Sequence, residues 1–402
     1  MNKTIKMKIV DWWNRVDGEH FYQNYFVKLL QQKYNVIYSD KPDFILYSCF
    51  GDSHLKYDCV RIFFTGENIS PDYNITDYAM SFDYCDFGDR HIRLPLMFWH
   101  KIGEKTDGQN CLETRNQFLK NKTKFCSFVV SNGALTQTRD KFFDALCSYK
   151  RVDSAGRWKN NMGYNVKNKI EWLKSYKFNL CFENSSQPGY LTEKLFDAFM
   201  SGCVPIYWGD TSLLCKKNYD STIINNNKPK HKIDYSDSNY GGGGGKNTFD
   251  TRMPNIPSHL IEYEINPKAF INAHNFSTFE DLIDEIRRID NDNKAFADML
   301  NEPVFLNNFD LQKFYSEKAF NFLDYIVSQG PILAKRRGYS IRHVWHENNM
   351  KCMENRVKDI ECRMKLIEQE ASYFFKHRRL ILMIKKTSEL PRDLLRKLRK
   401  KY

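Results

Sequence analysis

The chain has 402 residues and is rich in aromatic side chains (30 Phe, 23 Tyr and 7 Trp), which is enough to build two domains with buried cores. Its formal net charge is +12, and the whole excess belongs to residues 331–402, which hold 20 Lys and Arg against 8 Asp and Glu, whereas the other residues hold 41 of each sign. The balanced charge of that larger part argues against nucleic-acid binding, and the lack of any run of about 18 apolar residues argues against a membrane-spanning helix.

Short apolar runs alternate with a helical pattern over the first 120 residues, which predicts an open α/β sheet. The expected strands are 5–12, 36–38, 44–47, 60–64 and 78–84, and the expected helix is 20–34. Glu67 directly follows the strand at 60–64, so we expect its carboxylate at the end of that strand. The polar stretch 100–121 indicates a linker, and we place the end of the first domain at residue 120.

The same alternation returns in residues 121–330 and predicts a second α/β domain. Its expected strands are 125–130, 151–153, 178–182 and 204–208, and its expected helices are 139–149, 169–176, one that starts at Thr192, one that opens with a capping box at Ser277–Glu280, and 314–328. Residues 220–258 include five consecutive glycines and predict a flexible insertion, either a mobile flap over a ligand or a segment without function.

Residues 176–210 form a strand–loop–helix–strand unit around which the second domain is organised. Ligands of α/β proteins bind at the carboxyl ends of strands, so the loop 183–190 is the expected binding site. Thr192 is a suitable N-cap and Gly202 a suitable helix end. Phosphate binds well at a helix start, where Lys194 adds positive charge. The alternative is that Glu193 and Lys194 are solvated charges of an ordinary helix.

Three segments resemble motifs of the α-1,3/4-fucosyltransferases, in the order in which that family has them. They are GENISPDYNITDYAMSFDY (66–84), KRVDSAGRWKNNMGYNVKNKIEWLKSYKF (150–178) and FNLCFENSSQPGYLTEKLFDAFMSGCVPIYWGD (178–210). The last segment is similar to the family's donor-binding signature, FENS–GYxTEK–(D)A–PIYWG. The similarity covers roughly residues 1–330 and is closest to the bacterial enzymes that make Lewis-type fucosylated glycans.

The resemblance implies a GT-B fold, with two Rossmann-like domains that face each other across a cleft. Residues 1–120 would bind the acceptor and residues 121–330 would bind GDP-fucose. The implied reaction is the inverting transfer of L-fucose from GDP-fucose to the 3-hydroxyl, or the 4-hydroxyl, of N-acetylglucosamine in a Gal-β-GlcNAc acceptor.

An inverting transfer needs a base that takes the acceptor's proton and groups that stabilise the departing diphosphate. The resemblance assigns the base to Glu67, and Glu193 is a second catalytic candidate that would stabilise charge at the anomeric carbon or bind a sugar hydroxyl. Glu183 is a polar candidate for the ribose or the guanine, and Asp72 and Asp83 are expected to be structural. The expected donor-binding residues are Arg157, Asn184, Tyr190, Glu193, Lys194 and, as a weaker candidate, Arg139.

Two cationic side chains and a helix start can stabilise a diphosphate without a metal. Because no Asp-x-Asp motif lies beside these residues, we expect no obligatory metal or cofactor, and a divalent cation that is at most stimulatory. Two other functions stay open: an inverting GT-B transferase that uses another sugar nucleotide, and a non-catalytic, membrane-associated glycan-binding protein.

The segment 331–402 carries two further patterns. Apolar residues spaced alternately by three and four from Met350 to Phe374 form heptads, which predict a coiled coil and a homo-oligomer, or else a helix that packs on its own domain. The basic amphipathic stretches at 377–386 and 391–400 are typical of segments that bind anionic membrane surfaces, although a solvated basic tail would look similar.

Eleven cysteines without a Cys-x-x-Cys pair are typical of a reduced, cytoplasmic protein. The N-terminal segment MNKTIKMKIVDWWNRV lacks the apolar core of a signal peptide. We therefore expect a cytoplasmic protein that associates peripherally with the inner face of the membrane.

Overall fold

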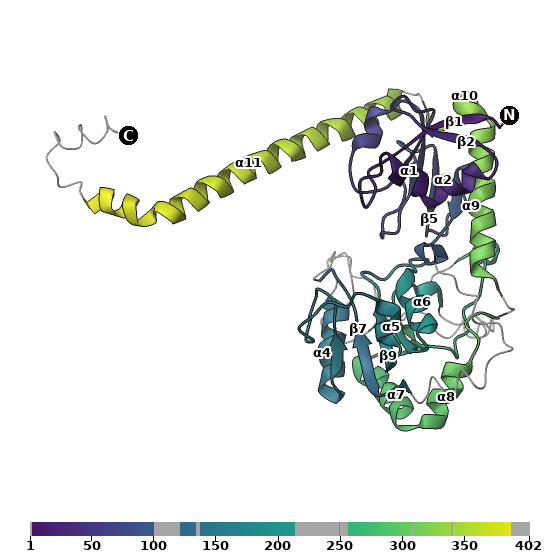
Figure 1. The fold of residues 1–402 in the computed structure, drawn as a ribbon, viewed down its shortest axis with the longest axis vertical. Helices are drawn as coiled ribbons and strands as arrows, with labels where there is room; N and C mark the ends of the chain where they lie inside the picture. The colour runs from purple at the N-terminus through teal and green to yellow at the C-terminus, as the bar shows by residue number, and fades with distance from the viewer. Residues whose placement is uncertain are drawn as a thin grey trace, which may run out of the picture. The chain divides into compact units, whose positions relative to one another are not determined.

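A computed structural model describes residues 2–99, 121–133, 137–213, 249, 256–306, 309–338 and 341–386. The chain divides into two compact units, Met1–Arg337 and Gly338–Tyr402 (Figure 1). Most of the linker expected at 100–121, most of the insertion expected at 220–258 and the basic stretch at 391–400 lie outside the described residues.

The first half of the larger unit is built on a six-stranded, all-parallel sheet in the order β2-β1-β3-β4-β5-β6. The strands are β1 (Thr4–Val10), β2 (Asn35–Tyr38), β3 (Phe44–Tyr47), β4 (Val60–Phe64), β5 (Tyr78–Ser81) and β6 (His91–Arg93). Every residue of β3, β4 and β5 is buried, as expected of central strands that are covered on both faces. The edge strand β6, only three residues long, was not predicted from the sequence.

The helix predicted at 20–34 is two helices, α1 (Glu19–Gln23) and α2 (Tyr25–Gln31). Asn24 separates them, because its backbone is extended and its side chain accepts a hydrogen bond from the Phe26 N–H at 3.0 Å. An Asn in this conformation is a favourable N-cap, which outweighs the continuous apolar stripe on which the prediction rested.

The second half contains a five-stranded parallel sheet in the order β11-β10-β9-β7-β8. Its strands are β7 (Lys124–Phe128), β8 (Val152–Ser154), β9 (Tyr176–Phe182), β10 (Val204–Trp208) and β11 (Ile271–Asn272). Its helices are α4 (Gln137–Tyr149), α5 (Lys169–Leu173), α6 (Glu193–Met200), α7 (Phe279–Asn291) and α8 (Asn293–Asn301). Two parallel-sheet, Rossmann-like regions confirm the predicted α/β class.

The predicted capping box is displaced by one residue. The N-cap of α7 is Thr278, whose hydroxyl accepts from the Asp281 N–H at 3.1 Å, while the Asp281 carboxylate accepts from the Thr278 N–H at 3.2 Å. Asp281 therefore takes the part that the sequence pattern gave to Glu280.

Helix α9 (Leu311–Ser328) packs on the first half although it follows the second half in the chain. The Tyr34 hydroxyl donates to Asp324 at 2.6 Å, Lys33 pairs with the same carboxylate at 2.8 Å, and the Tyr25 and Ser316 hydroxyls lie 2.8 Å apart. The prediction had assigned this helix to the GDP-fucose domain. Figure 1 shows α9 beside α2.

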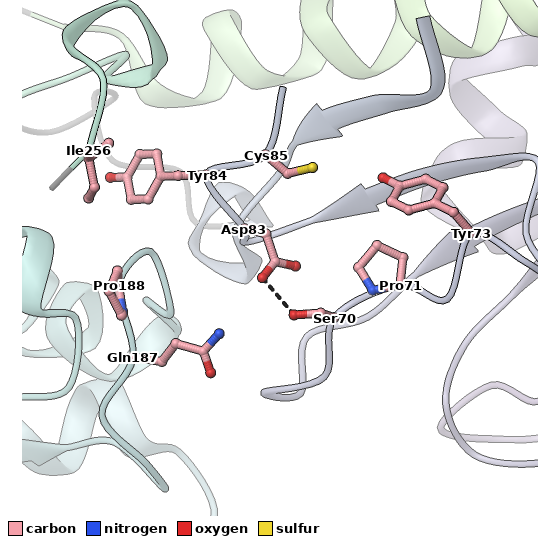
Figure 2. Close-up of a pocket in the computed structure, with 9 residues that line it drawn as sticks. All are labelled: Ser70, Pro71, Tyr73, Asp83, Tyr84, Cys85, Gln187, Pro188 and Ile256. Carbon is pink, nitrogen blue, oxygen red and sulfur yellow. Dashed lines mark hydrogen bonds between the residues drawn. The ribbon is translucent and has the colours of Figure 1, made fainter. Parts of the chain in front are cut away.

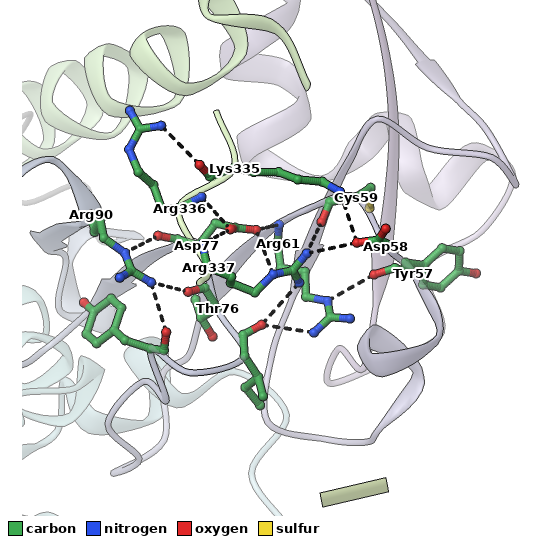
Figure 3. Close-up of polar contacts among 12 residues, drawn as sticks. Tyr57, Asp58, Cys59, Arg61, Thr76, Asp77, Arg90, Lys335, Arg336 and Arg337 are labelled. Carbon is green, nitrogen blue, oxygen red and sulfur yellow. Dashed lines mark hydrogen bonds and ion pairs between the residues drawn. The ribbon is translucent and has the colours of Figure 1, made fainter. Parts of the chain in front are cut away.

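Residues 331–337, which the prediction placed in the tail, are part of the larger unit. After the short helix α10 (Gly330–Leu333), the Arg336 and Arg337 N–H groups each donate to Asp77 at 2.8 Å. Asp77 is fully buried and also accepts from the Arg61 N–H at 2.8 Å (Figure 3). This network joins the last residues of the unit to the segment between β4 and β5.

The second unit consists of α11 (Ile341–Lys386), one long helix that contains the predicted heptads (Figure 1). Its apolar residues are largely exposed, with exposed fractions of 53 % for Val357, 55 % for Ile360 and 63 % for Ile367. Among the described residues, no helix is long and apolar enough to cross a membrane.

Candidate functional site

The candidate residues follow the carboxyl ends of parallel strands. Glu67 comes three residues after β4, Arg157 three residues after β8, and Asn184 two residues after β9. In a parallel sheet these ends share one edge, where α/β proteins bind ligands. Each sheet therefore presents its candidates at the edge that the sequence predicted.

Lys194 is held in place by Glu183 at the start of α6. The Lys194 ammonium lies 2.7 Å from Glu183 Oε2 and donates to the Thr192 hydroxyl at 3.0 Å. The Glu183 carboxylate also accepts from the Thr192 N–H at 2.9 Å and from the Thr192 hydroxyl. Glu193 Oε1 lies 3.9 Å from the same ammonium, which is an ion pair but too long for a hydrogen bond. An ammonium has three donors, so one of them remains for a bound anion.

Two expectations about this loop are corrected. Thr192 is the N-cap residue of α6, but its hydroxyl makes no capping hydrogen bond and donates to Glu183. Glu183 is fully buried, and its carboxylate accepts hydrogen bonds from Thr192 and Lys194, so it orients the loop from the protein interior. Glu183 is therefore not exposed to bind ribose or guanine.

The charges of this pair depend on each other. Burial raises the pKa of Glu183 above its usual range, while the nearby Lys194 opposes that shift. Burial alone would lower the pKa of Lys194, but Glu183 and Glu193 more than offset this effect and keep the pKa raised. Lys194 is therefore a lasting positive charge at the start of α6.

Arg139 brings a second cation to the same loop. It is fully buried on α4, donates to Asn184 Oδ1 at 2.8 Å, and also donates to the Asn132 carbonyl. Its guanidinium thus fixes the side chain of a predicted donor-binding residue. Arg139, the weaker candidate of the sequence analysis, is therefore hydrogen-bonded to Asn184, one of the stronger candidates.

Tyr190 is buried and feels charges from both halves of the larger unit. Its side chain is 2 % exposed and packs edge-on against Phe82 of the first half, with ring centroids 5.2 Å apart. Burial raises the pKa of Tyr190, and the charges of Glu183, Glu67 and Glu193 raise it further. Carboxylates from both halves therefore lie close enough to act on one phenol.

The loop that carries Glu67 contacts the loop after β9. The Thr65 hydroxyl accepts from the Glu67 N–H at 3.0 Å, and Asn68 Nδ2 donates to the Ser185 hydroxyl. Glu67 itself is half-buried. The candidate base and the candidate donor loop thus meet through adjacent residues.

Arg157 is exposed in the turn after β8. Gly156 before it allows a close approach of two backbones, because a Cβ atom there would lie 2.0 Å from the Val130 carbonyl oxygen. Trp158 after it donates from Nε1 to Asp140 at 3.0 Å. The residues on both sides of Arg157 are therefore packed against the domain, while Arg157 itself is exposed.

Sequence reasoning missed a residue that joins the two halves, Arg93 at the end of β6. This buried guanidinium donates to the carbonyl oxygens of Phe82 at 3.2 Å and Gly189 at 3.3 Å. Gly189 has φ +85°, and a Cβ atom there would lie 2.5 Å from the Phe82 carbonyl oxygen. A single arginine that ends an unpredicted three-residue strand has no signal in the sequence.

No cluster of three or more His, Cys, Asp or Glu side chains suited to a metal ion occurs in the described part of the chain.

Two family profiles match the sequence in chain order. Residues 7–100 match the N-terminal domain of the α-(1,3)-fucosyltransferase FucT, and residues 119–228 match the C-terminal part of glycosyltransferase family 10 (fucosyltransferase). The α-(1,3)-fucosyltransferase FucT of Helicobacter pylori is 30 % identical over 354 residues, which cover 79 % of this chain and 63 % of the relative. The chain thus spans less than two thirds of that relative's length.

Solved structures of an α1,3-fucosyltransferase have the same fold. The complex with GDP matches with a TM-score of 0.59 and 27 % identity, over 84 % of this chain and 94 % of that one. The complex with GDP-fucose matches with a TM-score of 0.54 and 27 % identity, over 80 % and 91 % of the two chains. These matches confirm the GT-B fold, and together with the two profiles they show that the chain belongs to glycosyltransferase family 10, the fucosyltransferases.

Proposed function

We propose that the chain transfers L-fucose from GDP-fucose to the 3-hydroxyl, or the 4-hydroxyl, of N-acetylglucosamine in a Gal-β-GlcNAc acceptor, with inversion at the anomeric carbon. Family membership and the GDP and GDP-fucose complexes of the similar structures support the donor. The observation that carries the proposal is the Asn68–Ser185 contact, because it joins the loop of a candidate base to the loop that leads into α6 and Lys194.

Glu67 acts as the general base. Its carboxylate takes the proton of the acceptor hydroxyl while that oxygen attacks the anomeric carbon from the face opposite the diphosphate. The new carbon–oxygen bond forms as the bond to the phosphate breaks, and GDP leaves with the electron pair. Glu193, the first residue of α6, stabilises the positive charge that develops on the sugar.

The diphosphate is bound by cations and by the start of α6. Lys194 is the fixed charge, Arg157 is the exposed guanidinium that closes onto phosphate oxygens, and Arg139 holds Asn184 toward the nucleotide. The first N–H groups of α6 add donors, since the Thr192 hydroxyl is bonded elsewhere. Tyr190 supplies an aromatic wall. This set makes a metal dispensable, and we expect metal-free enzyme to remain active.

Replacement of Glu67 tests the mechanism. In Glu67→Gln the side chain keeps its size and loses its basicity, so kcat should fall by at least about 100-fold, the scale of general-base catalysis. The dissociation constant of GDP, measured by titration calorimetry, should stay within about twofold because the donor loop is untouched. An unchanged kcat would remove Glu67 from the base role.

Product analysis separates the proposal from the alternatives. The wild-type enzyme, incubated with a panel of sugar nucleotides and with type 1 and type 2 lactosamine, should transfer fucose alone, and linkage mapping should give the position of the new bond. Transfer from another nucleotide would favour a different GT-B transferase. Glycan binding without any transfer would favour the non-catalytic reading.

The surroundings of the enzyme are part of the same proposal. We place it in the cytoplasm, associated peripherally with an anionic membrane surface through the basic C-terminal stretches, and self-associated through the heptads of α11. The exposed apolar residues of that helix support self-association.

A further inference from the structure

A cavity of about 440 Å³ lies between the two halves of the larger unit, a size typical of ligand sites. Figure 2 shows its lining, with side chains from both halves directed toward one space. The lining residues are Ser70, Pro71, Tyr73, Asp83, Tyr84, Cys85, Gln187, Pro188 and Ile256.

The lining includes Ser70, from the segment that follows the candidate base, and two residues of the loop between β9 and α6. Ser70 follows Glu67 by three residues, so their α-carbons are at most roughly 10 Å apart. Gln187 and Pro188 belong to the loop between Asn184 and Tyr190. A molecule in the cavity is thus within reach of both the base and the bound donor.

We propose that this cavity binds the glycan acceptor and that Asp83 restricts the site to neutral sugars. The inference rests on the proposed fucosyl transfer and adds a residue and a selectivity to it. Sequence reasoning had treated Asp83 as structural.

Asp83 is held rigidly with its carboxylate at the cavity. The Ser70 hydroxyl donates to Oδ1 and the Ser81 hydroxyl donates to Oδ2, each at 2.7 Å. Two carboxylate oxygens accept about four hydrogen bonds, so the pair retains capacity for sugar hydroxyls. The two serines lie on separate segments and fix the direction of the carboxylate before any ligand arrives.

Tyr84 forms a fixed aromatic wall beside Asp83. Its hydroxyl lies 3.0 Å from the Ser212 hydroxyl, and the Arg93 guanidinium is 4.4 Å from its ring centroid. Anchored aromatic faces next to hydrogen-bonding groups suit sugar rings, which have apolar faces and polar edges. Proline and isoleucine side chains complete the apolar part of the lining.

The charge of the lining argues for a neutral ligand. Among the nine described residues around the cavity, Asp83 has the one carboxylate and no lysine or arginine is present. An acidic sugar would bring a second negative charge close to Asp83 in a partly desolvated site, where like charges repel more strongly than in water. A neutral glycan instead donates hydroxyl hydrogens to the carboxylate.

Asp83→Asn tests the assignment with two probe acceptors, N-acetyllactosamine and its 3′-sialylated form. The variant should raise KM for the neutral probe by about tenfold or more, the effect of losing a hydrogen bond to a charged group. It should also lower the preference for the neutral over the sialylated probe, because the repelling charge is gone. GDP affinity should stay within about twofold.

Asp86→Asn is the matched control, since it removes the same charge from an exposed residue nearby that does not line the cavity. It should leave both KM values and their ratio unchanged. Equal effects of the two variants, or an unchanged ratio in Asp83→Asn, would overturn the proposal.

A binding measurement on the wild-type enzyme covers the case in which Asp83→Asn fails to fold. Cys85 lines the cavity, so N-acetyllactosamine should slow its alkylation at least about threefold, as read by peptide mass spectrometry, while Cys147 on α4 should react at an unchanged rate. Alkylation of Cys85 that the glycan does not slow would refute acceptor binding here. Protection of Cys85 in an enzyme that transfers no fucose would refute the proposed function and leave the glycan site standing.

Discussion

Glu183 illustrates how a single buried carboxylate organises the donor loop. It has no exposed surface, and it takes hydrogen bonds from the Thr192 N–H, the Thr192 hydroxyl and Lys194. A buried ion pair of this kind adds little stability compared with an apolar pair of similar size, but the loss of one partner is costly. The ion pair therefore matters for position more than for stability, because Glu183 holds the Lys194 ammonium at the start of α6.

His91 contacts Ser81, which donates to the cavity residue Asp83, and it should make the stability of the folded protein depend on pH. Its Nδ1 lies 2.8 Å from the Cys85 carbonyl oxygen, and its Nε2 lies 2.9 Å from the Ser81 hydroxyl, which donates to Asp83. Burial lowers the pKa of His91 below 6.5, helped by the positive charges of Lys318 and Arg93 and opposed by the Cys85 carbonyl and Asp83. The folded protein therefore prefers the neutral imidazole.

The sign of the pH effect follows from proton linkage. Below pH 6.5 the unfolded chain binds a proton on this histidine before the folded chain does, so stability is full above 6.5 and is lost as the pH falls toward the lowered folded pKa. Urea unfolding should give a lower free energy at about pH 5.5 than at about pH 7.5, and His91→Gln should reduce that difference. His259→Gln, at an exposed position, should keep the wild-type difference; equal slopes in all three proteins would exclude His91 as the cause.

At the scale of elements, the structure connects segments that are far apart in the chain. Helix α9, near the end of the larger unit, packs against α2 of the first half. The backbone N–H groups of Arg336 and Arg337 donate to Asp77, in the segment that follows Glu67. Arg337 also donates to the Cys59 carbonyl at 2.9 Å. The loop with the candidate base is therefore supported by the last residues of the unit.

Asp77→Asn should destabilise this junction. An amide nitrogen would face N–H donors that need an acceptor, and the buried Arg337 would lose its closest carboxylate, 3.5 Å away. We expect a loss of about 3 kcal/mol in the free energy of unfolding, as for other broken buried pairs. The matched control is Asp58→Asn, because Asp58 is 81 % exposed while pairing with Lys335 and Arg337; it should cost less than about 0.5 kcal/mol. Urea titration measures both, and similar losses would show that the buried network is not what matters.

At the scale of the whole molecule, the boundary between the units decides how the tail can be removed. Truncation after residue 338 should leave a larger unit whose melting temperature equals that of the full chain. The truncated protein should no longer form oligomers, as measured by sedimentation, or bind vesicles, as measured by flotation. Truncation after residue 330 should lower the melting temperature, because it also deletes the two arginines bound to Asp77. If the shorter tail deletion leaves oligomer size and vesicle binding unchanged, both roles proposed for the tail are wrong.

The strands and most helices were predictable because their signals are local. The apolar run FILY at 44–47 and the runs at 60–64, 178–182 and 204–208 are long enough to indicate buried strands without any knowledge of their partners. The local signals mislead where two residues could each cap a helix or where a cap interrupts an apolar stripe. Asn24 splits a predicted helix, and Asp281 replaces Glu280 in the capping box. Strands β6 and β11, three and two residues long, were not predicted.

The amino-acid sequence alone determined the α/β class with two Rossmann-like regions and the motifs typical of the family, because each strand, helix or motif depends on neighbours within a few positions. Only the tertiary structure decided that Glu183 orients Lys194, that Arg93 joins Phe82 to Gly189, and that Asp83 faces a cavity between the halves. Those roles depend on hydrogen bonds and burial between residues distant in the chain, and side-chain partners of that kind exist only once the sheets have packed.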